Sequence, residues 1–276
     1  MLTSKLTTLL CKATPALIVG FTLGFSSLDS SQNSALAQTE VTNTSELPAA
    51  FDSSSNPGSS PLITAGNYFQ PPRNPRPRGP RTTTGTRSGS CVGDPAAGFT
   101  IFGINSVVGH TAATHPEFVW YLPESDLSFP VTFRLLAPNA DGIPVPIHTV
   151  ALPYTSGFTK YQLPTNLPAL SANKEYRWQV IVECDPGYRA RSLAQELSFE
   201  VVALPAAAQL PDTATQVEKA LAYAKVGLWH DAIAQVALGA TPEAKQIRSG
   251  LLRDLAETEM DNEALSQDLL NIADLP

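Results

Sequence analysis

Short apolar runs separated by turn residues, with side chains that alternate at a period of two, restrict what residues 99–202 can form. The clearest run is 176–182, where Tyr176, Trp178 and Val180 fall on one face of an extended chain. Similar runs cover 118–122, 131–136, 147–152, 158–163 and 197–201. About six or seven strands with no helical period between them predict an antiparallel β-sandwich.

The segment before run 176–182 narrows this prediction. Residues 170–176 read Leu-Ser-Ala-Asn-Lys-Glu-Tyr, which resembles the tyrosine corner of fibronectin type III and immunoglobulin-like domains. In that motif a tyrosine at the start of a strand bonds to nearby backbone. We therefore expect residues 91–204 to form an immunoglobulin/fibronectin-III-like sandwich, in a chain that is mainly β with an α-helical tail.

From residue 210 the apolar period becomes helical, which predicts a helical tail over 210–276. Capping residues, and proline at a first helical position, indicate where helices start. We expect helices to begin near a capping box at 213–216, at Trp229, at Thr241-Pro242 and after Asp261.

Residues 221–233 look like the helix–turn–helix core of a tetratricopeptide repeat, which is a protein-interaction module. A solenoid of such repeats needs about three copies to be stable alone, and only one copy is legible here. We expect this small helical unit to pack on the sandwich or on a second subunit. Its candidate partner-binding residues are Tyr223, Gly227, Trp229 and Ala232.

Residues 1–37 read as a cleavable signal peptide. A basic beginning precedes the uncharged apolar stretch 16–25, and the small-x-small site 35–37 places cleavage between Ala37 and Gln38. A membrane-spanning helix needs about twice that apolar length; an uncleaved anchor is the alternative. We expect an extracytoplasmic protein without a transmembrane segment in the mature chain, located in the periplasm, at the outer-membrane surface or in the medium.

Residues 38–90 are poor in large apolar side chains, which predicts a disordered linker that is first Ser/Thr-rich and then Pro/Arg-rich. Proline at this density favours extended polyproline II geometry. Arginines spaced along such a tether could contact an acidic glycan, a lipid headgroup layer or another protein; a solvated linker is the alternative. The candidate acidic-surface residues are Arg73, Arg76, Arg78, Arg81 and Arg87.

After cleavage, Cys91 and Cys184 are the remaining cysteines. In an exported chain two cysteines are more often bridged than free. The bridge would close a loop of about 90 residues, which the chain-entropy model values at about 4–5 kcal/mol. We expect a Cys91–Cys184 disulfide, with two free thiols as the alternative.

Several motifs occur together in one order. An arginine-rich stretch leads into 89–91, His-Pro-Glu-Phe-Val-Trp-Tyr-Leu-Pro occupies 115–123, and 176–178 and 183–186 come before 223–233. The set resembles the cyanobacterial family called domain of unknown function 928, over roughly residues 85 to 260. The resemblance implies a cyanobacterial envelope setting and supplies neither an activity nor a catalytic residue.

His110 and His115, with Glu117 close by, come nearest to a metal cluster. The histidines lie five residues apart, which does not put both imidazoles on one helical face, and further ligands would have to come from elsewhere. We expect surface or turn histidines and no metal site.

Glu183 and Asp185 flank Cys184, and paired carboxylates can perform acid–base work in glycoside hydrolysis. The turn sequence Asp185-Pro186-Gly187 accounts for Asp185 without such a role. The aromatic residues Trp120, Tyr121, Tyr176, Trp178 and Trp229 could form a glycan-stacking platform, but we expect them in the core.

The sequence contains no nucleophile elbow, phosphate-binding glycine loop or dinucleotide fingerprint, so we predict neither an enzyme nor a cofactor. The formal net charge of −7 argues against general nucleic-acid binding. We predict an exported cell-envelope binding or scaffolding protein that contacts an envelope protein. The alternatives are a carbohydrate- or cell-wall-binding module and, more remotely, a cryptic hydrolase.

Overall fold

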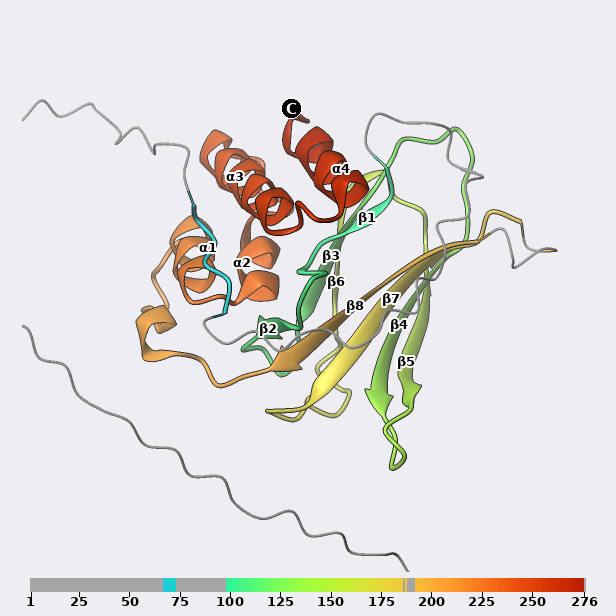
Figure 1. The fold of residues 1–276 in the computed structure, drawn as a ribbon, viewed down its shortest axis with the longest axis horizontal. Helices are drawn as coiled ribbons and strands as arrows, with labels where there is room; N and C mark the ends of the chain where they lie inside the picture. Colours follow the sequence, from blue (N-terminus) through green and yellow to red (C-terminus); the bar gives the residue numbers. More distant parts are fainter. Residues whose placement is uncertain (1–66, 73–97, 186, 188–191, 276) are drawn as a thin grey trace, which may run out of the picture. The chain divides into compact units, whose positions relative to one another are not determined.

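The computed structural model describes residues 67–72, 98–185, 187 and 192–275, all within one unit that spans Ser60–Pro276. In these ranges the chain forms two β-sheets followed by a group of α-helices (Figure 1). The strands are β1 (Thr100–Ile101), β2 (Gly109–Thr111), β3 (Glu117–Leu122), β4 (Val131–Pro138), β5 (Pro144–Leu152), β6 (Gly157–Gln162), β7 (Glu175–Val182) and β8 (Leu193–Val201). The helices are α1 (Gln216–Lys225), α2 (Trp229–Val236), α3 (Pro242–Thr258) and α4 (Glu263–Ala273).

One sheet has five strands in the order β2-β8-β7-β4-β5, and the other has three in the order β1-β3-β6. The strands predicted from short apolar runs are confirmed as β3 to β8. The predicted all-antiparallel pairing is wrong for β2, which runs parallel to β8 with Gly109 opposite Phe199. The chain leaves β2 for β3 in the other sheet, so no hairpin sets the direction of β2.

The side chains of β7 alternate in burial, as the sequence predicts. Tyr176, Trp178 and Val180 are buried on the face toward the three-stranded sheet, while the intervening residues are half-buried. The hydroxyl of Tyr176 accepts a hydrogen bond from the Ser171 amide at 2.9 Å. This is the backbone contact expected of a tyrosine corner.

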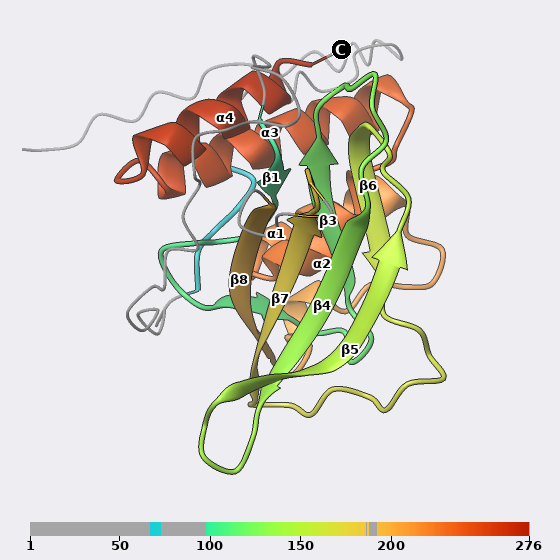
Figure 2. The same ribbon diagram turned by 90° about the vertical axis from the view of Figure 1, so that its right-hand side faces the viewer.

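Strand β3 lies between the five-stranded sheet and the helices (Figures 1 and 2). Phe118 and Trp120 point into the core between the two sheets, which we call the inter-sheet core. Val119 and Tyr121 point the opposite way, into the core shared with the helices, which we call the helix–sheet core. The predicted helical unit therefore packs on the sheet.

The helices begin where side chains cap them. Thr241 caps α3 just before Pro242, as the sequence predicts. Its hydroxyl accepts a hydrogen bond from the Ala244 amide. The capping box expected at 213–216 is instead formed by Thr215 and Glu218. The physical reason is that residues 211–214 form a turn, in which the Ala214 amide donates to the Pro211 carbonyl, so the helix starts later.

Two buried charged residues hold α3 in place. The guanidinium of Arg248 donates to the carbonyls of Ala237 and Gly239 at the end of α2, at 3.0 and 3.2 Å. The carboxylate of Glu259 accepts from the amides of Asn105 and Ser106 at 2.6 and 2.8 Å. These bonds fix α3 against α2 and against the loop between β1 and β2. Among the residues described, each helix is too short or too polar to cross a bilayer.

Candidate functional site

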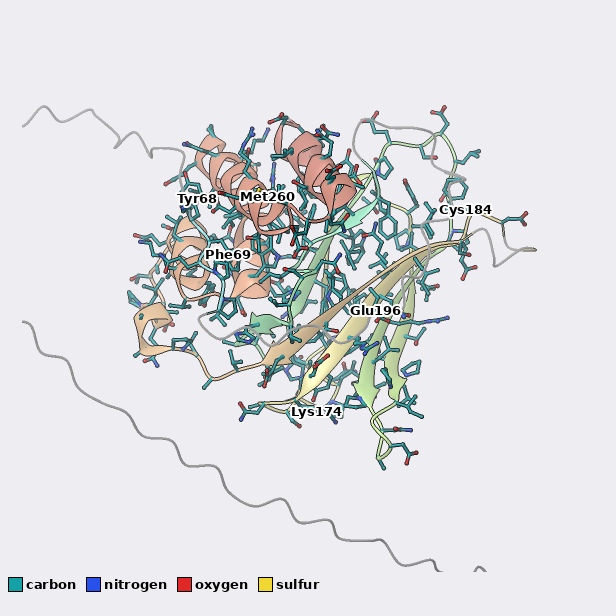
Figure 3. The ribbon with its side chains drawn as sticks, in the orientation of Figure 1. Tyr68, Phe69, Lys174, Cys184, Glu196 and Met260 are labelled. Atoms are coloured by element: carbon teal, nitrogen blue, oxygen red, sulfur yellow. The ribbon has the colours of Figure 1, made fainter. Side chains whose placement is uncertain are left out.

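Residues 67–72, which we call the strap, lie against α1, α2 and α3 (Figures 1 and 3). The prediction that residues 38–90 are disordered is wrong for this segment. Tyr68 and Phe69 are buried with 9% and 4% of their surface exposed. Two adjacent aromatic side chains bury enough apolar surface to hold a short extended segment that its polar neighbours would not order.

Phe69 makes the central contacts of the strap. Its ring meets the edge of the Trp229 ring with centroids 5.2 Å apart and planes at 81°. Its amide donates to the Asp254 carboxylate at 2.8 Å, and the next amide, of Gln70, donates to the Ala224 carbonyl at 3.0 Å. The strap is therefore held by backbone hydrogen bonds and by an aromatic side chain, which is how proteins hold extended peptides.

Two glycines leave room for the strap. A Cβ atom at Gly250, in the interior of α3, would collide with Cε2 of Tyr68. A Cβ atom at Gly227 would lie 3.1 Å from the Gln70 carbonyl oxygen, and Gly227 also has a φ of +80°, which disfavours other residues. We call the surface formed by Ala224, Gly227, Trp229, Gly250 and Asp254 the strap site.

Asp254 supplies the charge in the strap site. Burial raises the pKa of its carboxyl group, and the amides of Phe69 and Tyr68 oppose that rise by donating hydrogen bonds to the carboxylate. A carboxylate that accepts backbone amides fixes the direction and register of an extended chain. The Asp254 carboxylate could accept the same amides from a separate chain, so this contact does not require the strap to belong to the same molecule.

The four residues predicted to bind a partner take different places. Tyr223 is half-buried on α1, and Gly227 forms the turn before α2. Trp229 and Ala232 are fully buried in the helix–sheet core, so they support the site from within. Gly227 and Trp229 both touch the strap.

The first turn of α2 carries two further polar groups, the buried His230 and the half-buried Asp231. His230 lies against Gly103 and Gly109 and is ringed by aromatic side chains, the nearest being Phe199 with ring centroids 5.5 Å apart. The Nε2 atom of His230 has no hydrogen-bond partner among the described residues. Burial lowers the pKa of His230 to about 4, and the charge of the nearby His110 makes a smaller contribution in the same direction.

Asp231, the next residue, is enclosed differently. Its carboxylate accepts hydrogen bonds from the Thr111 hydroxyl at 3.1 Å and from the Ala112 amide at 2.9 Å. Burial nevertheless raises the pKa of Asp231 to about 6, with those hydrogen bonds opposing the rise. The pair joins α2 to β2 and its neighbours, and we assign it no chemistry beyond that.

The residues considered for a metal site serve separate purposes. His115 Nε2 lies 3.0 Å from the Leu167 carbonyl oxygen, and Glu117 forms an ion pair with Lys160 at 2.8 Å. Within the described ranges, no group of three or more His, Cys, Asp or Glu side chains gathers in a way that could hold a metal ion.

Asp185 of the carboxylate pair and the aromatic residues are also accounted for. Asp185 accepts a hydrogen bond from the Gly187 amide at 2.9 Å, which confirms the predicted turn. All the candidates for a glycan platform are buried, and their expected place in the core is confirmed: Trp120, Tyr121, Tyr176, Trp178 and Trp229.

Other predicted features lie outside the described residues. These are the signal peptide at 1–37, Cys91 and the tether residues Arg73, Arg76, Arg78, Arg81 and Arg87. Cys184 is described, and it follows the end of β7 opposite to Lys174 (Figure 3). The Cys91–Cys184 disulfide and the tether therefore stay predictions.

The sequence did not lead us to predict the strap or the strap site. Two signals were available: an adjacent aromatic pair, Tyr68 and Phe69, in a segment otherwise poor in such residues, and Gly250 inside a strongly helical stretch. A glycine in a helix interior costs about 1 kcal/mol relative to alanine, so it often marks a close approach of another segment.

Comparison with known proteins identifies a family. The model of the family described as Domain of Unknown Function (DUF928) matches residues 82–265, which is well over half of the chain. The match covers the strap site but not the strap. No curated protein matches the chain.

Proposed function

We propose a function from the site itself, because the chain belongs to the DUF928 family and that family's description carries no activity. The chain acts as an exported cell-envelope binding or scaffolding protein, and it works by protein–protein contact. The observation that carries this proposal is the strap site, where α1, α2 and α3 hold an extended segment by hydrogen bonds from two of its backbone amides and by an aromatic contact.

The geometry suits peptide recognition for a physical reason. Backbone hydrogen bonds such as those to Asp254 and Ala224 provide affinity for any extended chain, and the space left by Gly250 selects an aromatic ring. The helix pair α1–α2 supports a tetratricopeptide-like assignment, since it places Gly227 at the turn as such a pair does. The Tyr176–Ser171 bond supports an immunoglobulin-like origin for the sheets.

The cellular setting is part of the proposal. Support comes from the basic, apolar and small-residue pattern of 1–37, which is typical of a signal peptide, and from the arginine-rich linker, suited to an acidic polymer. N-terminal sequencing of the protein from native cells is expected to begin at Gln38. A chain that keeps residues 1–37 would contradict cleavage.

The aromatic candidates for a carbohydrate-binding platform are buried, so they offer no stacking surface within the part of the chain that the structure describes. The protein-contact proposal can be tested by placing a photoreactive amino acid at position 223, on α1, in the full chain expressed in native cells. The matched control carries the same group at Leu127, which is 63% exposed and lies between β3 and β4.

We expect crosslinks from position 223 to one or a few envelope proteins, at defined residues of those proteins, and none of these from position 127. Crosslinks that are the same from both positions, or capture of the bait without any partner, would contradict a contact through the helices.

A further inference from the structure

The strap fits its site as a ligand fits a binding pocket. Gly250 leaves space for one aromatic ring, Trp229 packs against the next, and Asp254 and Ala224 accept amides of the strap backbone. A glycine at position 250 weakens α3, because its helix propensity is lower than that of alanine. That cost is understandable if the site is shaped for an extended peptide that carries two adjacent aromatic residues.

The connection from the strap to the fold is long. Residues 73–97 separate Pro72 from the first described residue before β1, and their sequence is rich in proline, arginine, glycine and threonine. At about 3.3–3.6 Å per extended residue, such a connection has a maximal reach of about 80 Å. That reach is enough for the strap of one molecule to enter the site of another.

We propose that the strap site is a peptide-binding site whose partner in trans is the strap of a second copy of this chain. The proposal rests on the proposed function and specifies its partner. The same residues make the same contacts in both arrangements, so the choice depends on concentration. The covalently linked strap has an effective concentration of about millimolar order, which keeps an intact dilute chain closed on itself.

The test uses two variants of the full chain, each defective in one half of the contact. Gly250→Leu fills the space for Tyr68 and keeps an intact strap. The double variant Tyr68→Ala/Phe69→Ala keeps an intact site and has no aromatic strap. We expect each variant alone to sediment as a monomer and an equimolar mixture to form a one-to-one complex of twice the mass.

The matched control mixes Gly250→Leu with the unaltered chain, whose site is filled by its own strap, and we expect much less complex. Circular dichroism establishes that both variants are folded. If folded variants stay monomeric in the mixture at concentrations well above micromolar, exchange between copies is overturned.

A second measurement covers the case in which the double variant does not fold. The milder variant Phe69→Leu is titrated with a fluorescent peptide of the strap sequence Asn-Tyr-Phe-Gln-Pro-Pro, and anisotropy is followed. We expect saturable binding that a peptide with alanine at both aromatic positions lacks. Equal binding of the two peptides overturns the site.

The two proposals fail separately. Peptide binding without a complex between variants overturns the second copy as partner and leaves protein contact standing. Crosslinks from position 223 to a second copy in cells support both proposals.

Discussion

The inter-sheet core and the helix–sheet core are assembled from the sequence in different ways. The inter-sheet core is built from alternate residues of the strands. For example, the centroid of the Phe118 ring lies 5.0 Å from the ring centroids of both Phe133 and Trp178. The helix–sheet core combines the opposite face of β3, four helices and the strap. The first core follows from local periodicity, whereas the second depends on segments that are far apart in the sequence.

The largest expected difference between the two cores comes from truncating one phenylalanine in each. Phe118→Ala should lower the free energy of unfolding by about 3–5 kcal/mol, because the surrounding sheets cannot close the cavity. Phe69→Ala should cost clearly less, because the strap can detach while the rest stays folded. Denaturant unfolding measures both, and hydrogen exchange of the Gln70 amide should speed up in Phe69→Ala.

The control for this pair is Leu127→Ala, at a residue that is 63% exposed. Its effect should stay within about 0.5 kcal/mol. If Phe69→Ala unfolds the protein as readily as Phe118→Ala, the strap is an integral part of the core and the contrast between the two regions fails.

The second prediction concerns pH, at the start of α2, where the His230 ring packs against aromatic side chains of the inter-sheet core. His230 has a folded pKa of about 4 against an ordinary 6.5, so the unfolded chain takes up the proton first as pH falls and stability is lost between those values. Asp231 has a folded pKa of about 6 against 3.8, so its protonation favours the folded state over nearly the same interval. The two slopes oppose each other.

Asp231→Asn should remove one slope and expose the other. Relative to the unaltered chain, the variant's free energy of unfolding should fall by about 2 kcal/mol more as pH goes from 6.5 to 4, since one pKa unit is about 1.4 kcal/mol. Taking the difference between the two proteins cancels the titration of other carboxylates. His230→Leu should shift the pH dependence of stability in the opposite direction. An unchanged pH dependence in Asp231→Asn would refute the opposing contributions of the two residues.

Glu259 tests how firmly the helices are tied to the loop between β1 and β2. Its carboxylate accepts hydrogen bonds from the Asn105 and Ser106 amides and from the Ser106 hydroxyl. Glu259→Gln should cost about 1–2 kcal/mol, because its Oε1 can still accept these bonds but the charge that strengthens them is lost. Chemical denaturation gives the value, and exchange of the two loop amides should accelerate.

The matched control is Glu257→Gln, two residues earlier on α3 and exposed. It should leave stability nearly unchanged. Equal effects of the two substitutions would mean that the loop contacts of Glu259 contribute nothing measurable.

The smallest expected effect is also the most specific test, because the sign of the change in stability reverses between two backgrounds. Gly250→Ala alone should destabilise the chain, since the new Cβ would collide with the Tyr68 ring. In a Tyr68→Ala background the same change should stabilise by up to about 1 kcal/mol, through the better helix propensity of alanine. A double-mutant cycle measures the coupling, and additive effects would show that Tyr68 does not occupy that space.

Much of the fold was predictable because its signals are local. The strands β3 to β8 and the starts of α2 and α3 follow from alternation, helical period and capping residues. The parallel pairing of β2 was not predictable, because three residues carry no periodicity and no hairpin fixes their direction. Of the site, Gly227 and Trp229 were found from a repeat-like pattern.

The remainder of the site depends on contacts across long stretches of sequence. Phe69 and Asp254 meet over 185 positions, and neither residue shows by its neighbours that it has a partner. Composition favoured disorder for 38–90, and it averaged out the two aromatic residues that hold the strap. The aromatic pair itself and one helical glycine, Gly250, were the local traces of that contact.

Strand β3 is buried on both faces, and this has a consequence for inheritance. Loss of the gene segment that encodes the helices would leave Val119 and Tyr121 facing water. The sheets and helices must therefore be passed on together, and the family match over 82–265 spans both. Variation in length is better tolerated at exposed turns, such as the one around Gly142, where descendants of this protein can acquire new segments without disturbing either core.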